Sequence, residues 1–293
     1  MGGSEPNGIF LARPEEPFEG KRLAVKDLFD TAGLTTTYGS VIYAEHVPDR
    51  SAEALTRLEA AGYANVGKTN LHEFAYGITS VNPHFGTVPN PRSPGRMAGG
   101  SSGGSAAAIA AGLAEYALGT DSGGSIRIPA ACCGIVGFKP SYGLVSLDGV
   151  FPLAPSFDHA GPMAGSVRAC EEMLEALADG YEPAPLDSLE ELEVGVAWLD
   201  RADPLVRARV GEAAELFRGG ARSTSHSQSG SGPCSCARPP TSIATCSLSS
   251  RTPTATMSAR RSNAAWRSPT VSTRPACALA PSSLSEPRRR WMA

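Results

Sequence analysis

Two short runs rich in glycine and serine carry the residue types that could do chemistry in this sequence: GGSSGGS at residues 99–105 and DSGGS at residues 121–125. An alanine-rich segment joins them, and an apolar run follows the second. Glycines allow successive backbone N–H groups to point into one concavity, which is what stabilisation of an oxyanion requires. Ser125 closes such a turn and is therefore a candidate nucleophile, although one GGS run alone is more often only a tight turn.

A serine nucleophile needs a base. The chain has five histidines, and none of them lies in the two glycine runs. The other common partner is a buried lysine that desolvation keeps neutral. Lys26 lies in the apolar stretch LAVKDLF and is a candidate for this role. On spacing alone, a structural lysine paired with Asp27 or another acid remains open.

Three separated motifs then occur together: AVKD around Lys26, GGSSGGS, and GTDSGGSIRIPA at residues 119–130. With the flanking stretches GKTNLHEFAYGITSVNPHFG and SFDHAGPMAGSV, the sequence resembles the amidase signature family from about residue 21 to residue 218. The resemblance implies an α/β fold, a mixed sheet flanked by helices. It also implies hydrolysis of a carboxamide through an acyl-enzyme, which gives a carboxylic acid and ammonia or an amine.

The resemblance assigns a role to each candidate residue. It implies that Ser125 is the nucleophile, that Ser101 is a bridging serine beside a cis peptide bond, and that Lys26 is the neutral general base. It implies an oxyanion hole made by the backbone N–H groups of Ser122, Gly123, Gly124 and Ser125. Asp121 and Arg127 resemble the structural ion pair that lies beneath this loop in the family.

Two rival motifs compete with this interpretation. Residues 62–69, GYANVGKT, match the G-x-x-x-x-G-K-T phosphate-binding loop. That loop needs a strand before its first glycine, whereas a helix is predicted there, so Lys68 is expected to be dispensable for the chemistry. Residues 100–104 match the G-x-S-x-G elbow with Ser102 as nucleophile. Asp158 and His159 are adjacent in sequence, so they are poor candidates for the separated acid and histidine that this elbow requires.

Alternating helices and strands must position these residues. The patterns predict helices at 51–62 with Ser51 as N-cap, at 105–112, at 166–180, and from Asp203 onward. They predict strands at 63–69 and 192–199. Such alternation is typical of a sheet covered by helices. The small side chains of the 105–112 helix would let both serine loops approach the lysine strand.

The composition changes sharply near Arg218. Residues 1–218 carry 28 of the 29 acidic residues, whereas residues 219–293 carry ten arginines, 17 serines and one acid, Glu286. Residues 1–218 are therefore predicted to be the N-terminal part of an amidase signature domain whose C-terminal part is missing. Residues 219–293 are predicted to be a low-complexity basic tail rich in Ser, Arg and Pro, either disordered or read out of frame.

Charge, hydrophobicity and cysteine content limit the partners and the cellular location that can be expected for the protein. A net charge of −3 argues against a nucleic-acid partner, and no apolar span is long enough to cross a membrane. Cys132, Cys133 and Cys170 are expected to be reduced and packed, no secretion signal is seen, and the predicted location is cytoplasmic. No metal or other cofactor is expected, since Cys234 and Cys236 lack further ligands at metal spacing.

The expected partner is a small-molecule amide. The flanking motifs favour a stand-alone amidase. The alternatives are the glutaminase subunit of a tRNA-dependent amidotransferase and a non-catalytic remnant. The amide, the oligomeric state and the activity of this chain are left open by the sequence.

Overall fold

The computed structural model describes residues 8–15, 19–183, 188, 192, 194–197, 199–217 and 222–224. The chain divides into two units, Met1–His226 and Ser227–Ala293, and all described residues belong to the first. Apart from residues 222–224, the tail predicted for residues 219–293 lies outside the described residues. Those three residues form β10 (Arg222–Thr224), which pairs in parallel with β9 (Gly195–Ala197).

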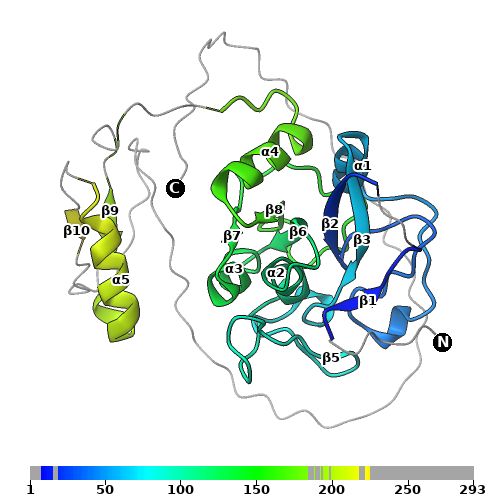
Figure 1. The fold of residues 1–293 in the computed structure, drawn as a ribbon, viewed down its shortest axis with the longest axis horizontal. Coiled ribbons are helices and arrows are strands. Elements are labelled where there is room, and N and C mark those ends of the chain that lie inside the picture. Colours follow the sequence, from blue (N-terminus) through cyan, green and yellow to red (C-terminus); the bar gives the residue numbers. More distant parts are fainter. Residues whose placement is uncertain are drawn as a thin grey trace, which may run out of the picture. The chain divides into compact units, whose positions relative to one another are not determined.

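A six-stranded mixed sheet is the central element of the first unit (Figure 1). Its strand order is β1-β3-β2-β6-β8-β7, in which β2 runs parallel to both β3 and β6, and the other pairings are antiparallel. The strands are β1 (Phe10–Ala12), β2 (Lys21–Lys26), β3 (Tyr63–Thr69), β6 (Tyr116–Asp121), β7 (Val136–Gly137) and β8 (His159–Ala164). The short strands β4 (Val81–Asn82) and β5 (Gly86–Thr87) pair separately. The predicted mixed sheet is confirmed.

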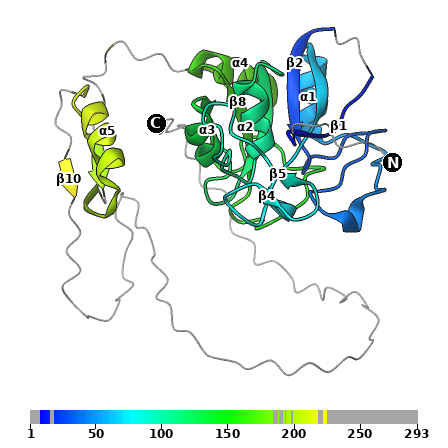
Figure 2. The ribbon, with the colours of Figure 1, turned by 60° about the horizontal axis from the view of Figure 1, so that its bottom comes forward.

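Helices cover both faces of this sheet (Figure 2). The α-helices are α1 (Glu53–Ala60), α2 (Gly103–Ala110), α3 (Arg127–Cys133), α4 (Val167–Leu177) and α5 (Pro204–Ala214). Short 3-10 helices occur at η1 (Val41–Tyr43), η2 (Glu73–Ala75) and η4 (Leu199–Arg201). One apolar cluster joins the sheet to α2 and α3, and a second joins it to α1 and α4.

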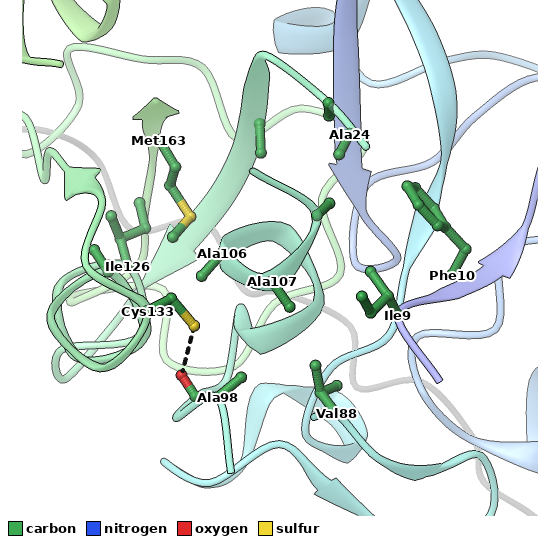
Figure 3. Packing of buried hydrophobic residues seen from close by; sticks show 14 of the residues in the cluster. Ile9, Phe10, Ala24, Val88, Ala98, Ala106, Ala107, Ile126, Cys133 and Met163 are labelled. Carbon is green, nitrogen blue, oxygen red and sulfur yellow. Dashed lines mark hydrogen bonds between the residues drawn. The ribbon is translucent and has the colours of Figure 1, made fainter. Parts of the chain in front are cut away.

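The period-two alternation of β2 separates the two clusters. Ala24 belongs to the α2 side, whereas Leu23 and Val25 belong to the α1 and α4 side. On the α2 side the packed helix surface consists of small residues, and Ala106 and Ala107 are fully buried among larger apolar side chains (Figure 3). These small residues allow α2 to lie close to the sheet, as the sequence predicted.

The helix caps test the sequence patterns one by one. Ser166, the first residue of the helix predicted at 166–180, caps α4 by accepting from the Ala169 N–H (3.2 Å). Asp203, where the last helix was predicted to begin, caps α5 by accepting from the Leu205 N–H (2.9 Å). The prediction of Ser51 as the cap of α1 is wrong, because the N-cap is Ala52 and the Ser51 hydroxyl accepts from the Ala32 N–H at 3.1 Å. A tertiary contact therefore replaced the local cap.

The cysteines are only partly as expected. Cys132, Cys133 and Cys170 are free, and burial raises the pKa of the Cys133 and Cys170 thiols to about 11 and about 12. Cys132 is exposed, so the prediction that all three are packed is wrong for this residue, which lies on the outer side of α3. Within the described ranges, no helix combines the length and apolar character needed to cross a membrane.

Lys68 lies in strand β3 and is completely buried. Its ammonium lies 3.2 Å from Oδ1 of Asp27 and donates to Oγ1 of Thr36 (2.9 Å) and to the carbonyl oxygen of Phe29. Burial lowers the pKa of Lys68 and the Asp27 carboxylate opposes that shift. Because α1 precedes this segment and the strand itself carries the lysine, the residues form no phosphate-binding loop. The expectation that Lys68 is dispensable can hold only for the chemistry and not for stability.

We expect Lys68→Met to lower the free energy of unfolding by about 3–5 kcal/mol, because it leaves the Asp27 carboxylate buried without its cation. Urea unfolding at pH 7 would measure this loss. Arg50→Ala is the matched control, because it removes an exposed ion pair with Asp148 and should change stability by less than about 1 kcal/mol. Equal effects of the two substitutions would show that the buried pair contributes no more than the exposed one.

Candidate active site

Lys26 is the last residue of β2 and its side chain is completely buried. Its Nζ lies 2.7 Å from Oγ of Ser101 and 2.7 Å from Oγ1 of Thr120. Thr120 is near the carboxyl end of β6, and parallel neighbouring strands bring their carboxyl ends to one edge of the sheet. The neighbouring acid Asp27 pairs with Lys68 instead. The two partners of Lys26 in the described structure are therefore hydroxyl groups and not a carboxylate.

The amine of Lys26 is tuned towards its neutral form. Burial lowers the pKa of Lys26 to about 7, an effect that the negative charges of Asp121 and Asp158 partly oppose. A neutral amine has a lone pair that can accept a proton, whereas an ammonium has only donors. Lys26 can thus act as a base near neutral pH, which an ordinary lysine with a pKa of about 10.4 cannot do.

The Ser101 loop is fixed by hydrogen bonds to its carbonyl group. The peptide bond between Gly100 and Ser101 is cis, as the resemblance implied. The carbonyl oxygen of Ser101 accepts from the His72 N–H (3.2 Å) and from the Ser80 hydroxyl (3.1 Å). Ser80 also accepts from the Gly103 N–H at 3.1 Å, so it links the loop to the start of α2. The Ser101 hydroxyl is thereby held towards Lys26.

Ser102 is a structural residue. It is fully buried at the N-cap of α2, and its hydroxyl donates to the Thr120 carbonyl oxygen (3.2 Å) and accepts from the Thr120 N–H (3.3 Å). His159, the histidine that the elbow motif would need, directs Nδ1 to the carbonyl oxygen of Phe157 at 2.6 Å. The G-x-S-x-G match is therefore part of the support for α2 and not a nucleophile elbow.

Ser125 is buried, with 6% of its surface exposed, and lies beside the Ser101 loop. Its carbonyl oxygen accepts from the Ser102 N–H at 3.1 Å, which ties the two glycine-serine runs together. No hydrogen bond joins the Ser101 and Ser125 hydroxyls among the residues that the structure describes. Catalytic hydrogen bonds often shorten only when substrate is bound, so the backbone bond between the two runs is the contact that bears on the position of Ser125.

Asp121 organises the turn that carries Ser125. Its carboxylate accepts from the N–H groups of Gly124 (2.7 Å) and Ile126 (3.1 Å) and from the Arg127 guanidinium (2.9 and 3.0 Å). Burial alone would raise the pKa of Asp121, but the bonds from Arg127, Gly124 and Ile126 outweigh it and lower the pKa. The ion pair implied for Asp121 and Arg127 is present.

The Gly124 bond changes the expected set of oxyanion donors. The resemblance implied that Ser122, Gly123, Gly124 and Ser125 share this role, but the Gly124 N–H already donates to Asp121. Within the described structure, the N–H groups of Ser122, Gly123 and Ser125 do not donate to Asp121. The sequence could not reveal this, because a run of glycines does not show which amide turns towards the preceding carboxylate.

Other residues at the site also escaped the sequence analysis. Thr120 and Ser80 have no distinguishing local pattern, although Thr120 lies within the GTDSGGS motif. Gly104 matters for space: a Cβ atom there would lie 2.3 Å from the carbonyl oxygen of Asn70, which accepts from the Gly104 N–H at 2.9 Å. This close approach holds the start of α2 against the segment that follows β3.

The comparisons with known proteins all point to one family. The family model described as Amidase matches residues 8–215. A glutamyl-tRNA(Gln) amidotransferase subunit from Thiobacillus denitrificans is 47% identical over 205 residues, covering 70% of this chain and 42% of that protein. The chain thus spans about half the length of the curated relatives it matches.

Solved structures agree with this result. The glutamyl-tRNA(Gln) amidotransferase subunit from Thermotoga maritima has a TM-score of 0.65 and 36% identity, covering 73% of this chain and 53% of that one. The peptide amidase from Stenotrophomonas maltophilia has a TM-score of 0.61 and 35% identity, covering 69% of this chain and 47% of that one.

We expect Gly104→Ala to lower the free energy of unfolding by at least about 2 kcal/mol, because the added methyl group meets backbone that cannot move alone. Thermal or urea unfolding would measure the effect. Gly165→Ala is the control, since its Cβ would have no heavy atom within 4 Å. A Gly104→Ala variant as stable as Gly165→Ala would contradict the close approach described here.

Burial of Lys26 predicts a specific dependence of stability on pH. Its folded pKa of about 7 lies below the unfolded value of about 10.4, so between these values the unfolded chain holds the extra proton. The stability of the wild type relative to Lys26→Met should therefore rise with pH across this window, by at most about 1.4 kcal/mol per unit, and stay constant below it. Unfolding of both proteins at several pH values measures the difference. A difference independent of pH would contradict the lowered pKa.

Proposed function

Because the chain belongs to the amidase family, we propose that it hydrolyses a carboxamide through an acyl-enzyme on Ser125, with Ser101 and Lys26 as the proton relay. The observation that carries this proposal is the 2.7 Å contact between a buried amine of lowered pKa and the Ser101 hydroxyl. A hydroxyl alone is a weak nucleophile at neutral pH and needs such a base. The backbone bond from Ser102 to Ser125 supports the proximity of the second serine.

In the proposed acylation, Oγ of Ser125 attacks the amide carbonyl carbon while its proton passes to Ser101 and the proton of Ser101 passes to Lys26. The tetrahedral oxyanion then collapses, the C–N bond breaks, and the leaving amine takes a proton back along the same relay. Water repeats the sequence on the ester and releases the carboxylic acid. Thr120 has a defined part in this scheme, because its hydroxyl oxygen can accept a hydrogen bond from an N–H of Lys26 and so direct the lone pair of the amine towards Ser101.

The proposed oxyanion donors are the N–H groups of Ser122, Gly123 and Ser125. Support comes from the turn geometry, in which Gly124 and Ile126 are already engaged by Asp121. Their engagement fixes the turn before substrate arrives, and a preorganised donor costs no reorganisation during the reaction. Each such donor is typically worth about 10²–10³ in rate.

The proposed partner is a small-molecule amide, with no metal or other cofactor in the scheme. The described part of the chain has two cavities. Val196 and Phe217 are among the residues that line the first, and Arg13 and Glu59 are among those that line the second. Neither is lined by Lys26, Ser101 or Ser125, so neither cavity belongs to the proposed relay. The cytoplasm is the proposed location, which the three free cysteines of the described residues support.

A second candidate is supported by the names of the curated relatives, which are subunits of glutamyl-tRNA(Gln) amidotransferases. In that case the amide would be that of glutamine and the ammonia would pass to a tRNA-linked acceptor on a partner protein. Hydrolysis of glutamine compared with simple carboxamides, each with and without charged tRNA and partner subunits, separates the two. A non-catalytic remnant, the remaining alternative, would hydrolyse neither substrate under any of these conditions.

The full chain tests the nucleophile directly. We expect a fluorophosphonate probe to modify the wild type on Ser125 and to leave Ser125→Ala unmodified, as read by mass spectrometry of peptides. Lys26→Met and Ser101→Ala should slow both labelling and amide hydrolysis by at least about 10²-fold, because the three residues act as one relay. Arg50→Ala is the control and should label at the wild-type rate. Labelling at another serine, or none at all, would refute the assignment or favour the non-catalytic form.

A further inference from the structure

Asp158 is a buried carboxylate that the proposed relay does not use. It lies immediately before β8 and accepts from the N–H groups of Leu153 (2.9 Å) and Ala154 (2.9 and 3.1 Å). Its Oδ1 also accepts from the hydroxyl of Ser122. Ser122 is the first residue of the 122–125 turn, so a segment distant in sequence reaches the turn through this one side chain.

Two carboxylates therefore hold the turn from its two ends. Asp121 takes the N–H groups of Gly124 and Ile126, and Asp158 takes the hydroxyl of Ser122. In the described structure the N–H groups of Ser122, Gly123 and Ser125 donate to neither of these carboxylates. The arrangement fixes the amides that the proposed reaction needs without consuming them.

The two carboxylates differ in their counter-charges. Asp121 pairs with the Arg127 guanidinium, whereas no cation pairs with Asp158 within the described ranges. Lys26 interacts electrostatically with Asp121 on β6, with Asp158 before β8, and with His72 after β3. Both carboxylates raise the pKa of Lys26, Asp121 more than Asp158, and Asp158 is the one of the two that does so without an ion pair of its own in the described residues.

We propose that Asp158 is a positioning residue for acylation: it fixes the 122–125 turn through the Ser122 hydroxyl, and its charge stabilises the Lys26 ammonium that forms when the relay takes the proton of Ser125. The first part stands on the hydrogen bonds of the turn. The second part rests on the function proposed above. Both roles would operate at the moment when opposite charges develop on Lys26 and on the carbonyl oxygen.

Three variants of the full chain separate these roles. Ser122→Ala removes the hydroxyl and keeps the charge of Asp158. Ser122→Thr restores a hydroxyl at the same position. Asp158→Asn keeps the shape and one acceptor oxygen but removes the charge. Ser125→Ala serves as the unlabelled reference for the fluorophosphonate reaction.

We expect Ser122→Ala to slow labelling roughly tenfold, part of what the loss of a whole oxyanion donor costs, with no change in the pH at which labelling falls. Ser122→Thr should label within about twofold of wild type. Asp158→Asn should slow labelling and lower the pH below which labelling falls, the acid limb of the pH–rate profile, by at least about half a unit, because an amine with one nearby anion fewer loses its proton more readily. A purely structural role of Asp158 would lower the labelling rate without changing the pH below which labelling falls.

Two further measurements do not depend on activity. Amide hydrogen exchange of the peptide containing Gly123 should be faster in Ser122→Ala than in wild type or Ser122→Thr. The pH window over which the wild type gains stability relative to Lys26→Met should begin at lower pH in the Asp158→Asn background. If the wild type is not labelled but the exchange and the pH window both change as expected, the proposed function is refuted, and of the role of Asp158 only its anchoring of the turn and its electrostatic effect on Lys26 remain. Unchanged exchange and an unchanged pH window would overturn the role of Asp158, whatever the labelling shows.

Discussion

The burial of one amine governs the arrangement around the site. A lysine enclosed by protein can stay charged only if an anion compensates the lost hydration, and otherwise its neutral form is favoured. Lys26 has two hydroxyl groups as direct partners, while the carboxylates of Asp121 and Asp158 act on it without a hydrogen bond. This is the compromise that places its pKa at about 7. A direct carboxylate partner would raise the pKa of the lysine and so make the neutral amine, the form that acts as a base, less abundant near neutral pH.

The sheet supplies the second requirement, which is close approach. The serine loops reach the lysine because α2 presents alanine and glycine to the strands and to the segment after β3. Larger residues would hold the helix away and open the 2.7 Å contact between Lys26 and Ser101. The glycine-serine composition that looks like a linker is therefore a packing requirement, met where two loops and a strand end converge.

Much of this could be predicted from the sequence, and the parts that could not share a physical reason. The helix at 166–180 follows from local periodicity. The mixed sheet and the Asp121–Arg127 pair follow from the family resemblance, which rests on motifs of neighbouring residues. Thr120, Ser80 and the Ser122–Asp158 contact depend on which loops meet, and serine and threonine are too common to mark such meetings. The cap at Ser51 failed for the same reason, since its hydroxyl serves Ala32 instead.

Lys26 and Asp27 are adjacent in sequence, yet one approaches Ser101 and the other pairs with Lys68. Successive residues at a strand end point to opposite sides, so a slip of one position would exchange a base for an acid at the centre of the site. The β2–β3 pairing already contains a register irregularity between Leu23 and Ala24, and its last matched pair is Lys26 with Thr69. Insertions and deletions in this strand should therefore be far less tolerated than substitutions, because they would invert the local charge pattern instead of weakening a single contact.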